Sequence, residues 1–172
     1  MTRTYVITGS ASGIGQATAE KLKSLGNTVI GVDIHNADVV ADLSTPQGRI
    51  DAAKKAIELS HDSIDAVIAC AGLAHPTATT VSVNYFGVTE FLNELLPTLT
   101  KSKTPRVVIT SSVASIMPNS TELVEAMCAN DEAKAVEIAQ ALVDAAAGGE
   151  QLIYGSTKRA ISRWIRQQCL KP

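Results

Sequence analysis

The sequence has few aromatic residues, few cysteines and little net charge. Aromatic residues make up 3% of the 172 residues and hydrophobic residues 45%, so aliphatic side chains have to fill the core. A chain of this length predicts one domain, and we expect residues 1–172 to form it. The formal net charge of −2 gives no electrostatic reason to expect binding to nucleic acid or to an anionic membrane.

The sequence also lacks the patterns of a disulfide framework, a metal site and a membrane anchor. Cys70, Cys128 and Cys169 are far apart and odd in number, which indicates thiols in a reducing cytoplasm. The three histidines make no metal-ligand pattern with them. No apolar run reaches the roughly 18 residues of a membrane span, and the first residues do not resemble a signal peptide. We therefore expect a cytoplasmic protein that binds no metal, membrane or nucleic acid.

Short apolar runs alternate with stretches of helical periodicity along most of the chain. The runs predict strands at 5–8, 28–32, 39–41, 64–70 and 106–110, and the periodic stretches predict helices at 13–26, 46–59, 81–99 and 153–168. Nearly continuous apolar strands are typical of a parallel sheet covered on both faces. The pattern predicts an α/β fold with a Rossmann-like, doubly wound parallel sheet, whose ligands bind at the carboxyl ends of the strands.

One segment interrupts this alternation. Residues 116–150 are rich in alanine and glutamate and have a helical pattern, with Pro118-Asn119 near the start and Gly148-Gly149 near the end. We interpret this segment as a helical insertion that precedes the last helix.

A glycine-rich motif joins the first strand to the first helix. It reads Thr8-Gly9-Ser10-Ala11-Ser12-Gly13-Ile14-Gly15. Glycines let backbone amides approach a pyrophosphate at a helix N-terminus, although a plain turn is the competing interpretation. Asp33 ends the second strand, where a carboxylate binds an adenosine ribose. Asp33 alone would suit a turn equally well, but its spacing from the glycines favours nucleotide binding.

The order of further motifs resembles that of the short-chain dehydrogenase/reductase family. The three residues between Gly9 and Gly13 match the family's spacing, and Tyr154-Gly155-Ser156-Thr157-Lys158 is similar to its Tyr-x-x-x-Lys. Ser112 resembles the family's catalytic serine, and Asn84 its catalytic asparagine. Ala71-Gly72 matches half of an Asn-Asn-Ala-Gly motif, in which Ala69 and Cys70 replace the asparagines.

Within that family, the sequence is similar to the bacterial 3α-hydroxysteroid dehydrogenases/carbonyl reductases. The similar segments are Asp33-Ile34, 41–45, 70–73, 81–87 and 111–115, together with the insertion before Tyr154. Complete members continue through two more strands and a Pro-Gly loop beside the nicotinamide. These C-terminal strands are missing from this chain, so we expect the natural protein to continue beyond Pro172.

The resemblance implies a role for each matching residue. Tyr154 would be the acid and base, Lys158 would support the phenolate and hold the nicotinamide ribose, Ser112 would bind the substrate oxygen, and Asn84 would hold a water that relays protons. The implied cofactor is NAD, because Asp33 would repel the 2′-phosphate of NADP. The implied cofactor-binding residues are Gly9, Ser10, Ala11, Ser12, Gly13, Ile14, Gly15, Asp33, Asp42, Leu43, Gly72, Tyr154 and Lys158.

Three functions remain open from the sequence. The leading one is an NAD-dependent 3α-hydroxysteroid dehydrogenase with carbonyl reductase activity, and the second is a dehydrogenase of a small alcohol or ketone. The third is an NAD-binding module without catalysis, which would have no need of Asn84, Ser112, Tyr154 and Lys158. We expect a homodimer, since the insertion would block the family's four-helix interface at the helices 81–99 and 153–168.

Overall fold

A computed structural model describes residues 2–145 and 148–169, and the chain divides into two compact units. The sheet unit comprises residues up to 71 together with 87–110. The helical unit comprises 72–86 and the residues from 111 onward. Each unit is therefore built from two separate stretches of the chain. The expectation of a single domain stays a prediction.

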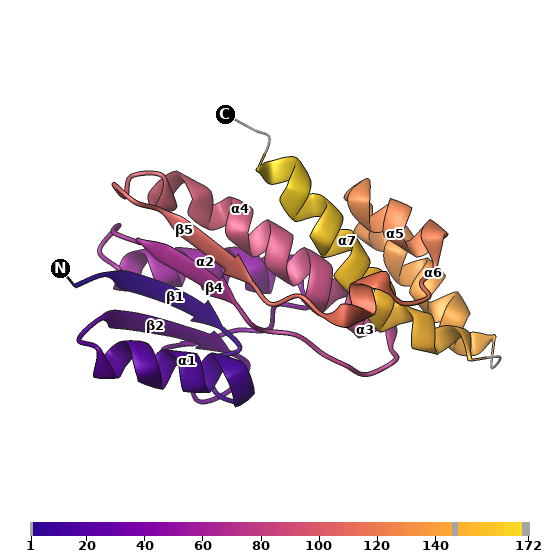
Figure 1. Cartoon of the computed structure of the whole chain (residues 1–172), viewed down its shortest axis with the longest axis horizontal. Helices are drawn as coiled ribbons and strands as arrows, with labels where there is room; N and C mark the ends of the chain where they lie inside the picture. The colour runs from indigo at the N-terminus through magenta and orange to yellow at the C-terminus, as the bar shows by residue number, and fades with distance from the viewer. Residues whose placement is uncertain (1, 146–147, 170–172) are drawn as a thin grey trace. The chain divides into compact units, whose positions relative to one another are not determined.

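Five parallel strands form the sheet (Figure 1). They are β1 (Thr4–Thr8), β2 (Thr28–Asp33), β3 (Val39–Val40), β4 (Ala66–Ala69) and β5 (Arg106–Ile109). Their order is β3-β2-β1-β4-β5, and every pairing is parallel. The chain runs outward from β1 in one direction and then outward from β4 in the other, so the order reverses between β1 and β4. This topology confirms the predicted doubly wound sheet, and it makes the β1–β4 junction the expected ligand position.

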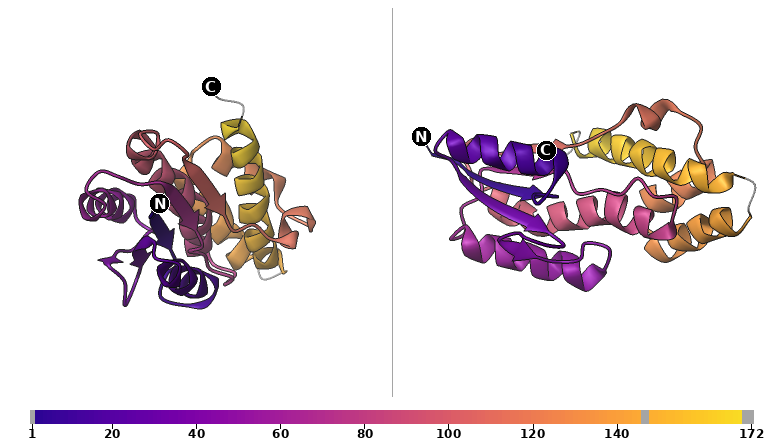
Figure 2. Two further views of the ribbon diagram at one scale, coloured as in Figure 1. Left: turned by 60° about the vertical axis from the view of Figure 1, so that its left-hand side comes forward. Right: turned by 90° about the horizontal axis from the view of Figure 1, so that it is seen from below.

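Three helices of the sheet unit cover the two faces of the sheet. They are α1 (Gly13–Ser24), α2 (Pro46–Leu59) and α4 (Gly87–Leu99). α1 lies on one face, while α2 and α4 lie on the other (Figure 2). Pro46 occupies the first turn of α2, and the Thr45 hydroxyl caps that helix by accepting a hydrogen bond from the Gly48 amide. Gly26, with a φ of +80°, follows the end of α1, as its sequence position predicts.

The buried stripe of α1 differs from the apolar pattern in the sequence. Ile14 and Leu25, which the pattern places on the inner face, are 70% and 63% exposed. Gly15 and Ala19 are the buried residues instead. Small side chains let the helix lie close to the sheet, so packing rather than hydrophobicity determines which face turns inward.

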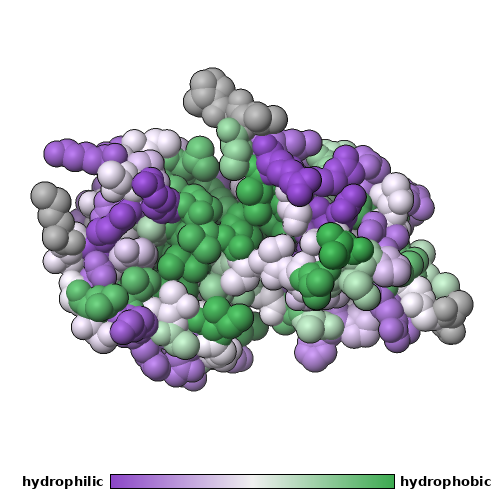
Figure 3. Space-filling view, viewed as in Figure 1, coloured by the Kyte–Doolittle hydropathy of each residue, from purple (hydrophilic) through white to green (hydrophobic). Residues whose placement is uncertain are grey.

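β5 forms one edge of the sheet in the described part of the chain. Its Val107 and Val108 are 43% and 55% exposed. Figure 3 shows apolar side chains at the surface over this region of the sheet. An apolar edge strand of this kind presents unpaired backbone groups, which folded proteins normally cover.

The helical unit contains the predicted insertion. Its elements are α3 (Ala78–Val81), the π-helix η1 (Ser82–Phe86), the 3₁₀ turn η2 (Val113–Ile116), α5 (Thr121–Cys128), α6 (Glu132–Asp144), the 3₁₀ turn η3 (Gly149–Gln151) and α7 (Leu152–Gln168). Within the described residues, the predicted helical insertion at 116–150 contains the α-helices α5 and α6, between which Asn130 has a φ of +59°. Residues 146–147 of the predicted insertion lie outside the described residues.

The predicted helix at 81–99 also has a more complex form. It begins earlier, at Ala78, and passes through the five-residue π-helix η1 before α4. Its predicted apolar stripe is buried as expected at Val88, Leu92, Leu95 and Leu99. Across residues 2–145 and 148–169, the helices lack the combination of length and apolar character that crossing a membrane requires.

Candidate active site

The glycine-rich turn between β1 and α1 is so tight that two of its glycines leave no room for a side chain. Gly9 has a φ of +70°, and a Cβ atom on it would lie 2.7 Å from the backbone nitrogen of Ala71. A Cβ atom on Gly15 would lie 2.0 Å from the carbonyl oxygen of Gly9. The turn therefore brings bare backbone to the β1–β4 junction, which is the arrangement that a pyrophosphate requires.

The first turn of α1 offers amide donors to a ligand. α1 begins at Gly13, and in the described part of the chain no side-chain hydrogen bond from Ser12 caps it. The unpaired amides and the positive end of the helix dipole favour an anionic group at this position.

Asp33 ties the end of β2 to the glycine-rich turn. Its Oδ2 accepts a hydrogen bond from the Ala11 amide at 2.9 Å, and its Oδ1 accepts one from the Ile34 amide at 2.7 Å. Its carboxylate is half-buried, so lone pairs remain for a hydroxyl donor. The neighbouring Ile34 is 55% exposed, which offers an apolar surface that the sequence reasoning did not single out.

Asp42 and Leu43 lie in the turn between β3 and α2. The Asp42 Oδ1 accepts a hydrogen bond from the Ser44 amide at 2.8 Å. Hydrogen bonding from Ser44, assisted by the charge of Arg49, holds the pKa of Asp42 below its ordinary value, so this residue is ionised at neutral pH. The Leu43 side chain is buried, which leaves its main chain for any contact with a cofactor.

The end of β4 is fastened to β1 by Thr8. The Thr8 hydroxyl accepts a hydrogen bond from the Ala71 amide at 3.1 Å, and the Thr8 carbonyl accepts one from the Cys70 amide at 3.2 Å. These bonds hold the segment in which Ala69 and Cys70 replace the family's asparagines. Gly72, the next predicted cofactor-binding residue, follows as an exposed residue of the helical unit.

Tyr154 and Lys158 lie one turn apart on α7. The Lys158 ammonium nitrogen is 5.6 Å from the centre of the Tyr154 ring, and the Lys158 side chain is buried. A cation at this distance is attracted by the negative face of the aromatic ring. The spacing of the two residues on one helix face matches the Tyr-x-x-x-Lys motif of the sequence.

The turn that carries Ser112 packs against the first turn of α7. Ser112 caps η2, and its Oγ accepts a hydrogen bond from the Ala114 amide at 3.1 Å. A Cβ atom on Gly155 would lie 3.1 Å from the Pro118 carbonyl and 3.2 Å from the Ala114 carbonyl. Gly155 therefore lets η2 approach α7 closely. In the sequence, this close approach is indicated only by the glycine that lies between Tyr154 and Lys158 in the motif.

Asn84 is buried within the π-helix, where its side chain makes three hydrogen bonds. Its Oδ1 accepts one from the Leu73 amide at 2.7 Å, and its Nδ2 donates to the Leu73 carbonyl at 2.8 Å and to the Thr157 hydroxyl at 3.3 Å. The side chain thus links the start of the helical unit to α7. π-helical segments inside longer helices are frequent at functional sites.

Three large apolar side chains follow Ser112 at the surface. Val113, Ile116 and Met117 are 73%, 76% and 55% exposed. A cluster of exposed apolar residues next to a candidate catalytic serine is typical of a surface that contacts an apolar ligand.

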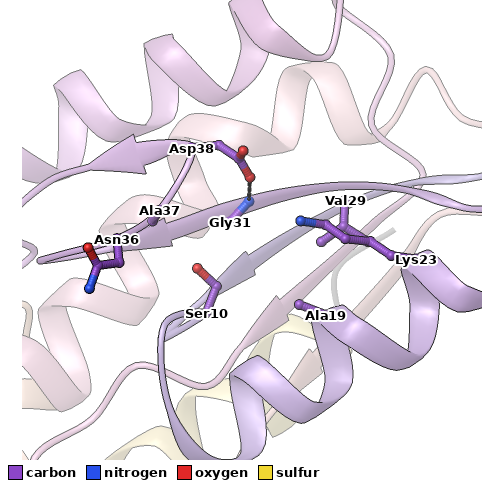
Figure 4. Close-up of a pocket in the computed structure, with 8 residues that line it drawn as sticks. All are labelled: Ser10, Ala19, Lys23, Val29, Gly31, Asn36, Ala37 and Asp38. Carbon is purple, nitrogen blue, oxygen red and sulfur yellow. Dashed lines mark hydrogen bonds between the residues drawn. The ribbon is translucent and has the colours of Figure 1, made fainter.

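A cavity of about 260 Å³ lies between α1 and β2 (Figure 4). Its lining includes Ser10, Lys23, Gly31, Asn36 and Asp38. The Asp38 carboxylate accepts a hydrogen bond from the Gly31 amide at 2.7 Å. Of the predicted site residues only Ser10 lines this cavity, so we do not assign the substrate to it.

The predicted residues are divided between the two units, and Gly72, Tyr154 and Lys158, which are also predicted to bind the cofactor, belong to the helical unit. Asn84, Ser112, Tyr154 and Lys158 all belong to the helical unit, where α7 contacts the elements that carry the other two. The predicted cofactor-binding residues of the glycine-rich turn, with Asp33, Asp42 and Leu43, all belong to the sheet unit.

Comparison with known proteins finds similar chains of the same fold. The 3-alpha-hydroxysteroid dehydrogenase/carbonyl reductase of Comamonas testosteroni is 39% identical over 168 residues, which cover 95% of this chain and 64% of that protein. The chain therefore spans less than two thirds of that relative's length. Coniferyl-alcohol dehydrogenase from Pseudomonas sp. (strain HR199 / DSM 7063) is 41% identical over 95 residues, 52% of this chain and 36% of that protein.

A crystal structure gives the corresponding likeness in three dimensions. The 3-alpha-hydroxysteroid dehydrogenase from Pseudomonas sp. B-0831, complexed with NADH, superimposes with a TM-score of 0.88 at 40% sequence identity, covering 96% of this chain and 71% of that one. Residues 3–124 match the model of the short chain dehydrogenase family. With the glycine-rich turn, the parallel sheet and the Tyr-Lys helix in place, this chain belongs to the short-chain dehydrogenase family.

Proposed function

We propose that the protein interconverts a hydroxyl and a carbonyl group with NAD(H) as the cofactor. The observation that carries the proposal is the pair on α7, where the buried Lys158 ammonium lies 5.6 Å from the centre of the Tyr154 ring. The turn that Ser112 caps packs against the same helix, which supports a role for the Ser112 hydroxyl together with this pair.

The residues of the sheet unit fit a dinucleotide. Gly9 and Gly15 give the pyrophosphate bare backbone, and the N-terminus of α1 gives it amide donors. Asp33 would accept hydrogen bonds from the adenosine ribose, and its charge would disfavour a 2′-phosphate. The relative from Pseudomonas sp. B-0831 was solved with NADH, which supports the same choice of cofactor.

The side chains of the helical unit would handle the substrate and its proton. The Ser112 hydroxyl would bind the substrate oxygen. The Tyr154 oxygen would take the hydroxyl proton as the phenolate during oxidation and would donate a proton as the phenol during reduction. Lys158 would stabilise the phenolate and hold the nicotinamide ribose. Because the Asn84 amide already makes three hydrogen bonds, the predicted water would bind its remaining Oδ1 lone pair or its main-chain carbonyl. NAD(H), when bound, supplies the group that accepts or donates the hydride.

A 3α-hydroxysteroid is the substrate class that we favour. Two relatives of about 40% identity are described as 3α-hydroxysteroid dehydrogenases. The exposed Val113, Ile116 and Met117 beside Ser112 suit an apolar ring system.

We further propose a cytoplasmic homodimer. Light scattering tests the dimer, and a stable tetramer would contradict it.

A small aromatic alcohol is the second candidate substrate. The 41% identity to coniferyl-alcohol dehydrogenase, over 95 residues, favours it. The absorbance of NADH formed with 3α-hydroxysteroids, 3β-hydroxysteroids, coniferyl alcohol and short aliphatic alcohols distinguishes the candidates. We expect the highest kcat/KM with 3α-hydroxysteroids. Tight NAD binding with no turnover on the whole panel would favour a binding module and refute the proposed reaction.

A further inference from the structure

Arg49 is a fully buried cation in the sheet unit. It lies on α2, where its relative exposure is 0%, and its buried neighbours on that helix are Ala52, Ala53 and Ala56. The apolar periodicity of the sequence places Ile50, Ala53 and Ile57 on one face, and of these only Ala53 is buried, while Ile50 and Ile57 are half-buried. A buried charge is costly unless it is paired and hydrogen-bonded, so the partners of Arg49 decide what it does.

The hydrogen-bond partners of Arg49 lie in the turn between β3 and α2 and on α4. The Arg49 Nε donates to the Leu43 carbonyl at 2.8 Å, and an Nη donates to the Ser44 carbonyl at 3.0 Å. The other Nη donates to the Glu90 carboxylate at 2.7 Å, and the Glu90 side chain is 32% exposed. A guanidinium can make these directed contacts at once because its donors form a rigid planar fork.

The turn held in this way also lies close to the first turn of α2. A Cβ atom on Gly48 would lie 2.0 Å from the Asp42 carbonyl oxygen, and the Gly48 amide donates to the Thr45 hydroxyl at 3.0 Å. The position of residues 42–44 is therefore determined by α2, through the bare backbone of Gly48 and the side chain of Arg49.

We propose that Arg49 is a positioning residue for nucleotide affinity, because it fixes the Asp42–Ser44 turn against which the adenosine half of NAD binds. Glu90 holds Arg49 in the orientation that this role requires. The inference rests on the proposed function, since NAD(H) is the cofactor proposed there, and on the family resemblance, which implies that Asp42 and Leu43 bind it. It implies that Arg49 acts on binding of the adenosine half and has no part in proton transfer.

The test measures dissociation constants for NAD and for ADP-ribose, which lacks the nicotinamide ring, on the whole chain by calorimetry. We expect Arg49→Lys to weaken the binding of both ligands by the same factor, about tenfold, because lysine keeps the charge and loses the fork. Glu90→Gln should weaken both by roughly threefold, because it leaves the two carbonyl contacts in place. Lys55→Ala removes an exposed cation from the same helix and should change neither affinity by more than about twofold.

Thermal unfolding and amide hydrogen exchange separate positioning from stability. In Glu90→Gln, whose amide oxygen can still accept a hydrogen bond from Arg49, the Ser44 and Thr45 amides should exchange faster than amides elsewhere in the sheet unit, whereas a purely global loss of stability would raise exchange throughout that unit. If Arg49→Lys does not fold, Glu90→Gln decides the question. A Glu90→Gln variant with unchanged exchange and unchanged ADP-ribose affinity would overturn the inference, as would a folded Arg49→Lys variant that keeps its ADP-ribose affinity. A parent chain that binds neither ligand would instead refute the proposed cofactor.

Discussion

Each of the two units carries candidate site residues of a different kind. The sheet unit relies on main chain: Gly9 and Gly15 matter because they have no side chain, and the amides of the glycine-rich turn are its working groups. The helical unit relies on side chains, since Asn84, Ser112, Tyr154 and Lys158 offer an amide, a hydroxyl, a phenol and an ammonium. The first arrangement tolerates many side chains but no added Cβ atom at the two glycines, while the second depends on single functional groups.

Burial also differs among these residues. Ile14 and Ile34 of the sheet unit are mostly exposed, although Gly15 is buried. Asn84 and Lys158 of the helical unit are buried at 2% and 7% exposure, while Ser112 and Tyr154 are half-buried. An exposed main-chain site suits a ligand that binds and leaves. Buried side chains held by helix packing suit chemistry that requires fixed positions. The predictions below test this contrast.

The largest effect should come from one atom of the helical unit. Tyr154→Phe removes the phenol oxygen and should lower kcat by roughly 10³-fold or more, because the proton donor is lost. The dissociation constant for NAD should change by less than about threefold, since the nucleotide is held mainly by the other unit. Stopped-flow and steady-state kinetics on the native protein measure both quantities.

Tyr5→Phe is the matched control for this loss. Tyr5 lies in β1 of the sheet unit and pairs in the ladder with Val29 and Ala66. Removing its hydroxyl should leave kcat and NAD affinity within about twofold of the parent. A Tyr154→Phe variant with kcat within tenfold of the parent would show that the phenol is not the proton donor.

Adding one methyl group to the glycine-rich turn of the sheet unit should weaken NAD binding, whereas Tyr154→Phe lowers kcat. Gly15→Ala places a Cβ atom 2.0 Å from the Gly9 carbonyl oxygen, so the turn has to open. We expect NAD affinity to fall by roughly a hundredfold and the free energy of unfolding to fall by about 1–3 kcal/mol. Calorimetry and urea unfolding measure these effects.

Gly26→Ala is the control for Gly15→Ala. It strains the backbone at a positive φ without placing a Cβ atom against the glycine-rich turn. Gly26 has a φ of +80°, but a Cβ atom on it meets no described atom within 4 Å. The variant should lose about 1 kcal/mol of stability and keep its NAD affinity. If Gly15→Ala also kept its affinity, the closed form of the turn would not be the form that binds the nucleotide.

The sheet unit could be predicted largely from the sequence, because each of its strands is a short apolar run that ends at a glycine or a polar residue. The predicted strand at 28–32 appears as Thr28–Asp33, with Asp33 at its end as expected. The predicted α2 has the observed bounds, Pro46–Leu59. What failed was the choice of buried face, since Arg49 was not considered an inner residue although its partners allow it to be buried.

The helical unit was harder to predict because its geometry depends on contacts that are distant in the sequence. The break at Asn130 is encoded by a left-handed conformation that asparagine tolerates, but an asparagine within an alanine-rich stretch gives little warning of it. The π-helix at Ser82–Phe86 has no distinctive composition. The hydrogen bond from Asn84 to Thr157 crosses 73 positions, and no periodicity could show it. The site residues named from the motifs stay a prediction, while the structure shows the packing at Gly155 and the hydrogen bonds of Asn84.

Substitutions of Asp33 should have a smaller effect on cofactor affinity. They separate the role of its charge from the role of its hydrogen bond to the glycine-rich turn. Asp33→Asn keeps an acceptor for the Ala11 amide and removes the charge, whereas Asp33→Ala removes both. We expect the NADP-to-NAD affinity ratio to rise by about tenfold in both variants, because a 2′-phosphate is no longer repelled. Only Asp33→Ala should also lose several-fold in NAD affinity. A parent protein that binds NADP(H) more tightly than NAD(H) would contradict the proposed role.

We expect the smallest effect when the pH is lowered, which should reduce the stability of the sheet unit before that of the helical unit. Hydrogen bonds from Ser102 and from the Thr4 amide, with the charge of Arg3, hold the pKa of Asp65 below its ordinary value. These contacts tie the start of β1 and the loop that precedes β5 to Asp65, the residue before β4. Since the folded state favours the ionised form, this contribution is fully present above pH 3.8, the ordinary pKa, and is lost as the pH falls through the lowered value.

Acid should therefore loosen β1 before it loosens α7. Within the described residues, the resolved aspartate shifts, at Asp42, Asp62 and Asp65, are all downward and all in the sheet unit. Hydrogen exchange followed by mass spectrometry from pH 5 to pH 3, corrected for the intrinsic exchange rate, should show protection falling first in peptides that contain β1. In Asp65→Asn, which is already unable to ionise, β1 should be less protected at pH 5, and the additional loss on acidification should be smaller than in the parent. Equal loss of protection in β1 and α7, unchanged by Asp65→Asn, would mean that the two units share one acid response, and the contrast between them would not extend to stability.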